Sequence, residues 1–275
     1  MEKLPRQNPA FVVKVLSQFI EGEVQKYNFQ GGVIALSGGL DSSVVAILSH
    51  QALQGQIRLI YMPYENSRES YNDALSVAKL LKIPLEVFDL KKVADPFFID
   101  RKPETRIRKG NILARLRMTA LFDLSSQEKA LVIGTSNKTE ILVGYSTWFG
   151  DSAAGILPIG DLYKTQVRQI ASFLSVPEGI IGKPPSAELW EGQTDEDEIG
   201  LTYDIMDQIL FKLVDQRFTI AEVIAMGYSA EEVKKVDNLT RKSLYKQKTP
   251  LICKVSDRTI GIDYRYLKET STIRD

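Results

Sequence analysis

The sequence has a single cysteine, Cys253, among its 275 residues. One cysteine can form neither an internal disulfide nor a Cys-x-x-Cys metal or redox site, so we expect a protein of a reducing compartment. Histidine is equally scarce. We expect the only one, His50, to have a structural role.

The sequence also lacks an excess of either charge, with 35 basic and 35 acidic residues. Proteins that bind nucleic acid or acidic membranes usually carry a basic surplus, so we expect neither partner. A membrane-spanning helix would need a run of about eighteen apolar residues, and none occurs. No apolar block suitable for a signal peptide begins the chain, because Lys14, Gln18 and Glu21 interrupt it. These absences predict a cytoplasmic protein.

The most informative stretch covers residues 33–43, VIALSGGLDSS. Its first four residues form an apolar run typical of a buried strand, and Val44 and Leu48 continue with the spacing of a buried helix. Glycine can adopt positive φ. Gly38 and Gly39 would therefore let backbone N–H groups close on an anion at the helix N-terminus.

Asp41 is the unusual member of this turn. A carboxylate beside bound phosphate repels it unless a divalent cation lies between them. Ser37, Ser42 and Ser43 add hydroxyl donors, so we infer a metal-bridged polyphosphate site. The alternative is a Ser/Gly-rich turn without a ligand. The turn lacks the Gly-Lys-Ser/Thr ending of a Walker A loop, and it resembles the SGGxDS pyrophosphate loop of the ATP pyrophosphatases.

Strand and helix patterns alternate along the first two thirds of the chain. A helix is expected after Asn8-Pro9, and strands are expected at residues 33–36, 57–62, 85–88 and 130–133. This alternation predicts an α/β protein with a doubly wound parallel sheet flanked by helices. Helices around 199–213, 219–226 and 230–247 predict a C-terminal helical segment. We divide this single domain into an N-terminal helical arm (about 1–30), an α/β core (about 31–175) and a helical C-terminal part (about 176–275).

Two further segments show neither a helical nor a strand period, and a third shows the start of a helix. Residues 95–109 are rich in Pro, Arg, Lys and Asp, so we expect a mobile lid or binding loop. Residues 144–162 hold four glycines and are expected to form an ordered functional loop. Thr194 precedes four acidic residues and is expected to be the N-cap of a helix.

A second polar loop, residues 134–137, follows the fourth expected strand. Open α/β sheets bind ligands outside the carboxyl ends of their strands, so this loop should face the same crevice as the glycine turn. Glu140 follows it closely. Asp41 and Glu140 could therefore share one Mg²⁺, and Lys164 could add a charge for phosphate.

Six further segments, together with the SGGLDS loop, resemble in order the blocks of the ammonia-dependent NAD synthetases. They are residues 110–118 (GNILARLRM), 134–140 (GTSNKTE), 144–151 (GYSTWFGD), 158–166 (PIGDLYKTQ), 185–190 (PSAELW) and 192–196 (GQTDE). The resemblance implies an adenine nucleotide alpha hydrolase-like fold and a homodimeric ligase. Such a ligase converts nicotinic acid adenine dinucleotide to NAD with ATP, Mg²⁺ and ammonia, through an adenylated carboxylate, and releases AMP and pyrophosphate.

The resemblance also implies roles for the matched positions. The ATP site would comprise Ser37, Gly38, Gly39, Leu40, Asp41, Ser42, Thr135, Lys164 and Ser186. Asp41 and Glu140 would hold Mg²⁺, and Arg115 and Lys246 would contact the dinucleotide. We expect Asp41 and Asp151 to be catalytic, with Asp151 aiding deprotonation of ammonium.

The sequence departs from the family pattern at three positions. Many members have Lys where Trp148 stands and Asp where Gly155 stands, and both contact the dinucleotide. A His-Lys pair expected to touch substrate aligns with Tyr245-Lys246, and only Lys246 fits. These departures leave the contacts to the acceptor open.

Two alternatives remain. One is another pyrophosphate-loop enzyme that amidates or thiolates a different acceptor, although a tRNA-thiolating enzyme usually needs more cysteines and a basic face. The other is a non-catalytic ATP-binding regulator, which would not need Arg115, Glu140 and the 144–162 loop together. We find no glutaminase domain before residue 30, so free ammonia or a separate partner is expected to supply the nitrogen.

Overall fold

A parallel four-stranded sheet forms the centre of the fold. The structure, a computed structural model, describes residues 4–5, 7–64, 68–103, 105–186, 194–247 and 250–260. The strands are β1 (Gly31–Ala35), β2 (Ile57–Tyr61), β3 (Leu85–Val87) and β4 (Ala130–Val132). Their order is β3-β2-β1-β4, and all neighbours are parallel. The predicted doubly wound parallel sheet is confirmed.

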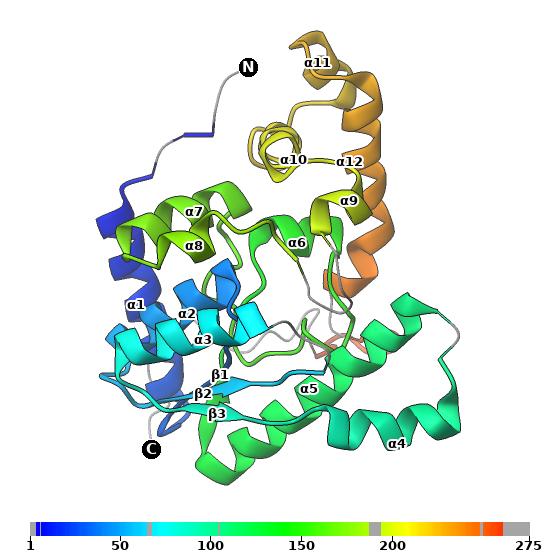
Figure 1. Cartoon of the computed structure of the whole chain (residues 1–275). Coiled ribbons are helices and arrows are strands. Elements are labelled where there is room, and N and C mark those ends of the chain that lie inside the picture. The colour runs from blue at the N-terminus through cyan, green and yellow to red at the C-terminus, as the bar shows by residue number, and fades with distance from the viewer. Residues whose placement is uncertain are drawn as a thin grey trace.

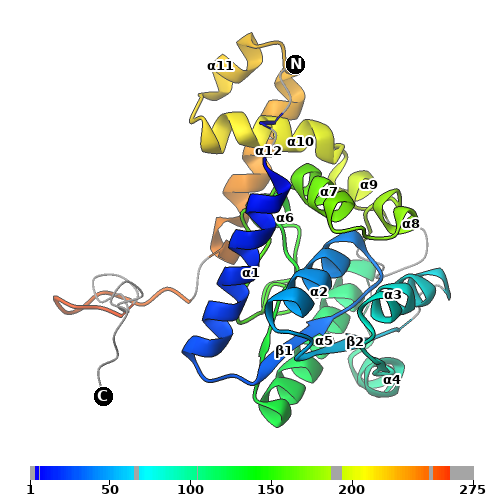
Figure 2. The same ribbon diagram turned by 90° about the vertical axis from the view of Figure 1, so that its left-hand side faces the viewer.

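Helices cover both faces of this sheet (Figures 1 and 2). Helices α1 (Pro9–Lys26), α2 (Leu40–Ala52), α3 (Arg68–Leu81), α7 (Lys164–Phe173) and α8 (Glu178–Ile181) share the main core with one face. Helix α5 (Arg106–Glu128) packs on the other face. Successive strand residues alternate between the two cores, as the pleat requires: Ile34 belongs to the first and Val33 to the second.

The last third of the described chain is helical, as predicted. Its elements are α9 (Asp195–Ile199), α10 (Tyr203–Leu210), a π-helical turn (Phe211–Asp215), α11 (Ile220–Ala225), α12 (Ala230–Ser243) and a 3₁₀ turn (Leu244–Gln247). They enclose a second core with α6 (Lys138–Val143), in which Tyr203, Met206 and Val236 are fully buried. The exact three-part division of the chain stays a prediction.

The loop expected at residues 95–109 is not found in the structure. Most of this segment is helical, because α4 (Lys91–Arg101) runs through its first half and α5 begins at Arg106. Leu90 and Ala94 are buried against Leu113 of α5, which anchors α4 despite its internal Pro96. The Lys109 ammonium also lies 4.5 Å from the centre of the Tyr64 ring. Only a short connection separates the two helices.

The segment 144–162 contains neither a helix nor a strand, and its Ile156 bridges to Ile133 beside β4. This fits the expected ordered loop.

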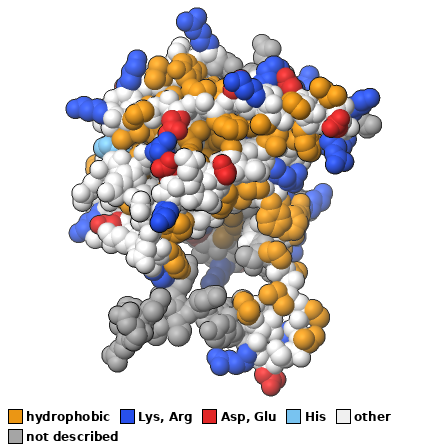
Figure 3. Space-filling view, turned by 90° about the horizontal axis from the view of Figure 1, so that it is seen from below, with side chains coloured by type: hydrophobic (Ala, Val, Ile, Leu, Met, Phe, Trp, Pro, Cys, Tyr) orange, Lys and Arg blue, Asp and Glu red, His pale blue; other side chains and the backbone are white. Residues whose placement is uncertain are grey.

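None of the helices in the described ranges combines the length and apolarity that crossing a membrane requires. Seen from below, hydrophobic side chains gather across the face, while lysine and arginine side chains lie mainly around its rim (Figure 3).

Candidate active site

The glycine turn lies between β1 and α2 and is braced by its serines. Gly38 has φ of +89°, and the Ser43 hydroxyl donates to the Gly39 carbonyl at 2.8 Å. The Ser37 and Ser42 hydroxyl oxygens are 3.1 Å apart, and Ser42 also donates to Gly39 O. Gly39 is the N-cap of α2 and has no side chain to cap the helix. The first-turn amides of α2 are therefore available to an anion.

Asn137 and Glu140 form the second half of the site, at the carboxyl end of β4. Asn137 is the N-cap of α6, and its Oδ1 accepts from Glu140 N at 3.0 Å. Glu140 Oε2 accepts in return from Asn137 N at 3.2 Å, which completes a capping box. Asn137 Nδ2 donates to Asp41 Oδ1 at 3.1 Å. Local helix capping thus fixes Glu140 and ties it to Asp41.

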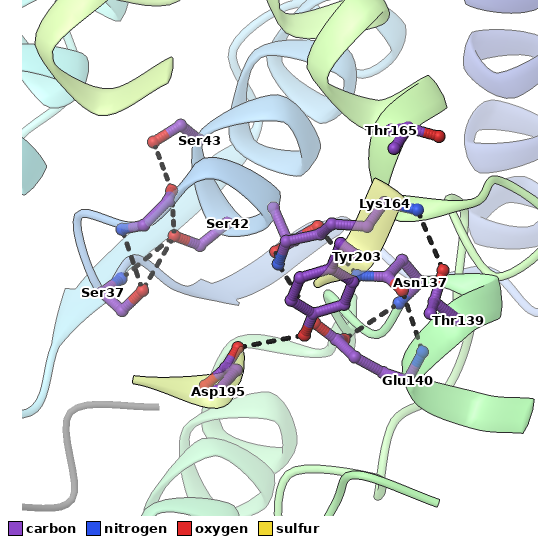
Figure 4. Close-up of polar contacts among 12 residues, drawn as sticks. Ser37, Ser42, Ser43, Asn137, Thr139, Glu140, Lys164, Thr165, Asp195 and Tyr203 are labelled. Atoms are coloured by element: carbon purple, nitrogen blue, oxygen red, sulfur yellow. Dashed lines mark hydrogen bonds and ion pairs between the residues drawn. The ribbon is translucent and has the colours of Figure 1, made fainter. Parts of the chain in front are cut away.

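Lys164, the first residue of α7, lies between the Asp41 and Glu140 carboxylates. Figure 4 shows Lys164 with Glu140, Asn137 and Tyr203 around it. Its ammonium donates to Asp41 Oδ2 and, at 3.2 Å, to Glu140 Oε1. It also lies 5.1 Å from the centre of the Tyr203 ring, a favourable cation–π position. Its side chain is 5% exposed, against 16% for each carboxylate. The predicted convergence of Asp41, Glu140 and Lys164 is therefore present.

Burial changes the proton affinity of this cluster. Desolvation raises the pKa of Glu140, and the Lys164 ammonium opposes this rise. Desolvation alone would lower the pKa of Lys164, but the charges of Asp41 and Glu140 outweigh it, and the pKa is raised. Lys164 therefore remains a fixed positive charge at neutral pH.

Two adjoining cavities open beside these residues. The first, of about 170 Å³, is lined by polar residues that include Asp41, Glu140 and Lys164. The second, of about 240 Å³, has largely apolar walls that include Leu36, Ile60 and Met118. Residues shared by both linings are Ser37, Gly39, Thr135, Asp151 and Ser186. A polar cavity at a helix N-terminus joined to an apolar one suits a molecule with a phosphate chain and a flat ring.

Comparison with known proteins agrees with this geometry. The family model described as NAD synthase matches residues 12–250. The chain belongs to the NAD synthase family. The NH(3)-dependent NAD(+) synthetase of Chlorobium phaeovibrioides is 42% identical over 268 residues, which are 97% of each chain.

Two solved structures are also similar to this member of the NAD synthase family. One is an NMN synthetase from Francisella tularensis, with a TM-score of 0.81 and 33% identity over 90% of this chain and 99% of that one. The other is the NH3-dependent NAD synthetase of Campylobacter jejuni, with a TM-score of 0.78 and 30% identity over 90% of this chain and all of that one.

Asp151 lies where the two cavities meet. Its Oδ1 accepts from Thr147 N at 2.6 Å, so the turn 147–151 sets its position. Desolvation by the surrounding walls raises the pKa of Asp151, while the hydrogen bond from Thr147 favours the charged form. A carboxylate with a raised pKa accepts a proton more readily than an ordinary one. The placement suits the role expected for Asp151, which stays a prediction.

The two residues expected to contact the dinucleotide lie outside these cavities. Arg115 donates from Nη2 to Trp148 O at 3.1 Å and lines a separate groove with Arg101 and Arg108. Lys246 donates to the carbonyls of Gly144 and Ser146, both at 2.7 Å. Both cations thus contact the backbone of the loop that carries Asp151. Their role in binding the acceptor remains a prediction.

The departures from the family pattern form part of the same loop. Trp148 stacks on Phe149, with 4.4 Å between ring centres, and meets Tyr245 edge-on at 5.4 Å. A Cβ atom at Gly155 would lie 2.4 Å from Leu131 Cδ1. An aspartate therefore cannot occupy position 155 without displacing Leu131.

Sequence reasoning missed several residues of the site. Thr194 does cap α9, but Asp195, to which the sequence assigned no role in the site, is 4% exposed and lines the first cavity. Tyr203 OH donates to Asp195 Oδ2 at 3.0 Å. The family-like residues 187–193 lie outside the described ranges. Asp207, fully buried on α10, was also missed, although its place on the apolar face of YDIMDQIL signals a buried carboxylate.

Proposed function

We propose that this protein is an ammonia-dependent NAD synthetase, a ligase that amidates nicotinic acid adenine dinucleotide at the expense of ATP. The observation that carries the proposal is Lys164 lying between Asp41 and Glu140 beside an uncapped helix N-terminus. This arrangement offers positive charge and oxygen ligands at one point, as pyrophosphate release requires. Relatives known as NH(3)-dependent NAD(+) synthetases, such as that of Chlorobium phaeovibrioides, indicate the reaction class.

ATP would occupy both cavities, with its phosphates in one and its adenine ring in the other. The phosphates would bind the first-turn amides of α2 and the Lys164 ammonium in the polar cavity. The adenine ring would enter the apolar cavity beside Ile60 and Met118. Thr135 and Ser186 line both cavities and so lie near the junction of the phosphates and the nucleoside.

The donor set of the site fits Mg²⁺. This ion is usually held by one or two carboxylates together with substrate phosphates and water, and Asp41 and Glu140 provide two carboxylates in the polar cavity. These two residues would hold the ion. When bound, Mg²⁺ would neutralise charge on the phosphates and polarise them toward attack.

The first chemical step forms the acyl adenylate. A carboxylate oxygen of the nicotinate ring attacks the α-phosphorus of ATP, and the bond to the bridging oxygen of pyrophosphate breaks. Negative charge moves onto the leaving pyrophosphate. The α2 amides and Lys164 are already oriented for that charge, so little reorganisation is needed as it develops.

The second step forms the amide. Ammonia attacks the carbonyl carbon of the adenylate, AMP leaves with the carbon–oxygen bond electrons, and the added nitrogen loses a proton to water to give the neutral amide. Ammonia in neutral water is mostly ammonium, so one proton must be removed before attack. Asp151 would accept this proton, since it lies at the junction of the two cavities and its pKa is raised by desolvation.

A second candidate acceptor is nicotinic acid mononucleotide. The similar Francisella tularensis structure is named an NMN synthetase, and Trp148 and Gly155 replace the Lys and Asp that many relatives offer to the dinucleotide. The chemistry at the carboxylate would be the same. Only the part of the site beyond the 5′-phosphate of the nicotinate ribose would differ.

The test supplies purified protein with ATP, Mg²⁺, ammonium and either acceptor, and measures AMP together with NAD or nicotinamide mononucleotide. We expect AMP and NAD in equal amounts, and no turnover by a folded Asp41→Asn variant. Nicotinamide mononucleotide as the preferred product would favour the second candidate. If AMP forms without either amide, the adenylation step stands and both proposed acceptors are wrong. If ATP binds and no AMP forms, the protein is an ATP-binding regulator.

Two finer features complete the proposal. A homodimer is supported by exposed apolar side chains on α4 and α5, where Ile99 is 72% and Ile107 67% exposed. Sedimentation equilibrium with an Ile99→Lys, Ile107→Lys variant tests this, and the variant should be monomeric. A cytoplasmic location is supported by the single, exposed cysteine, Cys253.

A further inference from the structure

Asp207 is a buried carboxylate that joins two helix N-termini. It lies on α10 and is completely inaccessible to solvent. Its Oδ1 accepts from the Thr139 hydroxyl of α6 at 2.6 Å, and its Oδ2 accepts from Thr165 N of α7 at 2.8 Å. One side chain of the C-terminal part therefore holds the first turns of both helices.

A relay extends this link to the reactive residues. The Thr139 hydroxyl, while donating to Asp207, accepts from Lys164 N at 3.0 Å (Figure 4). Thr139 directly precedes Glu140, and Thr165 directly follows Lys164. Asp207 is thus hydrogen-bonded to the sequence neighbour of Glu140 and to the sequence neighbour of Lys164. Fixing two helix turns relative to each other fixes the side chains that they carry.

A contribution to stability does not explain why position 207 holds a buried carboxylate. Burying a charge costs free energy, and an apolar side chain of similar volume often serves a core equally well. The anion is placed instead at two helix N-termini, where N–H groups and the helix dipoles favour it. We propose that Asp207 is a positioning residue that holds Lys164 between Asp41 and Glu140. The kinetic consequence of this positioning rests on the proposed ligase function.

Three variants isolate the relay. Asp207→Asn preserves the shape, but its amide NH₂ must face one of two donors, so one link is lost. Thr139→Val removes the hydroxyl with little change in shape, and Thr139→Ser restores it. We expect kcat to fall ~10- to 100-fold in Asp207→Asn and Thr139→Val, because small displacements of a positioned group cost rates of that order. The KM for the acceptor should change less than about threefold, and Thr139→Ser should stay near wild type.

A double variant separates positioning from general loss of stability. If Asp207 acts through Lys164, adding Asp207→Asn to Lys164→Ala should lower kcat by less than about twofold beyond Lys164→Ala alone. Val236→Ala truncates a fully buried residue of the second core, and its side chain takes no part in the relay's hydrogen bonds. This control should lower the unfolding temperature and leave kcat unchanged.

Crystal structures of wild type, Asp207→Asn and Thr139→Val give a readout that does not depend on the acceptor. We expect the Lys164 ammonium to move away from Asp41 and Glu140 in both variants. An unmoved ammonium, independent kcat losses in the double variant, or equal activities of Thr139→Val and Thr139→Ser would each overturn the proposal. If the wild type makes no amide while Lys164 moves as expected, the ligase function fails and the positioning role stands.

Discussion

Asn137 Nδ2 donates to Asp41 Oδ1 at 3.1 Å across the carboxyl ends of two neighbouring strands. The two residues are 96 positions apart in the sequence. The same Asn137 side chain caps α6 through its Oδ1, so helix initiation and the placement of Asp41 depend on one amide. The site therefore uses an ordinary helix cap to fix one carboxylate relative to another.

Removing this amide should affect stability and catalysis separately. We expect Asn137→Ala to lower the free energy of unfolding by about 1 kcal/mol, as loss of an N-cap usually does. Thr219→Ala removes the same kind of capping box from α11 and should cost a similar amount. Urea unfolding measures both. Only Asn137→Ala should also lower kcat, since Asn137 donates a hydrogen bond to Asp41, whereas the capping hydrogen bonds of Thr219 are made with Glu222. Equal activities of the two variants would refute the link to Asp41.

Much of the fold could be predicted because its signals are local. The strand and helix around the glycine turn appear as an apolar run and an apolar face, and both are buried in the structure. The segment 95–109 could not be read this way. Its helices depend on contacts between Leu90 and Ala94 of one segment and Leu113 of another, and a single sequence does not display such contacts.

The candidate site divides along the same line. Asp41 and Glu140 could be paired because parallel strands end at one edge of the sheet. Lys164 could be added because it begins a helix after a glycine-rich loop. Asp195 lines the polar cavity and Asp207 accepts hydrogen bonds from Thr139 and Thr165 behind it. Both residues belong to the C-terminal helices, whose packing against α6 and α7 is set by the tertiary fold. Acidic residues at a helix start are explained by their favourable interaction with the helix dipole, so the sequence offers no reason to expect that Asp195 is buried.

The two central glycines should tolerate substitution differently. Gly38 has positive φ, and a Cβ there would lie 2.4 Å from Ser70 O. We expect Gly38→Ala to lower the unfolding temperature by several degrees, because the backbone must shift. At Gly39 the nearest atom would be Ser37 Oγ at 3.3 Å, and φ is ordinary.

Gly39→Ala should therefore fold normally and fail at ligand binding. Its methyl group would stand beside the first-turn amides of α2, where bound phosphate must approach closely. We expect an unchanged unfolding temperature and a KM for ATP raised roughly fivefold or more. Scanning calorimetry and initial-rate kinetics measure the two effects. A normal KM in Gly39→Ala would indicate that phosphate binds elsewhere.

The pH dependence of stability should reveal the buried Asp207. Burial raises its pKa to about 6, against the hydrogen bonds from Thr139 and Thr165. The folded state then holds this proton more tightly than the unfolded chain, whose carboxyl has a pKa of about 3.9. The stabilising contribution is full below the unfolded pKa and is lost as the pH rises through about 6.

The neutral side chain of Asp207→Asn lacks this dependence. Between pH 4 and pH 7 the free energy of unfolding of wild type should fall relative to that of the variant by about 2 kcal/mol. Urea unfolding of both proteins at several pH values measures the difference, and other titrating groups cancel. A difference that stays constant or grows with pH would show that Asp207 is ionised throughout.

The aromatic residue at position 148 should influence the choice of acceptor. Trp148→Lys places a cation on the loop that carries Asp151, where the second phosphate of a dinucleotide could pair with it. We expect kcat/KM for the dinucleotide, relative to the mononucleotide, to rise roughly five- to tenfold, as about 1 kcal/mol of added binding would give.

Trp148→Phe is the matched control, because it also disturbs the contacts with Phe149 and Tyr245 without adding charge. Gly155→Asp is unsuitable for this purpose, since the clash with Leu131 would destabilise the loop. If the lysine and phenylalanine variants show the same acceptor ratio, position 148 does not sense the second nucleotide, and discrimination must lie elsewhere on the acceptor's path.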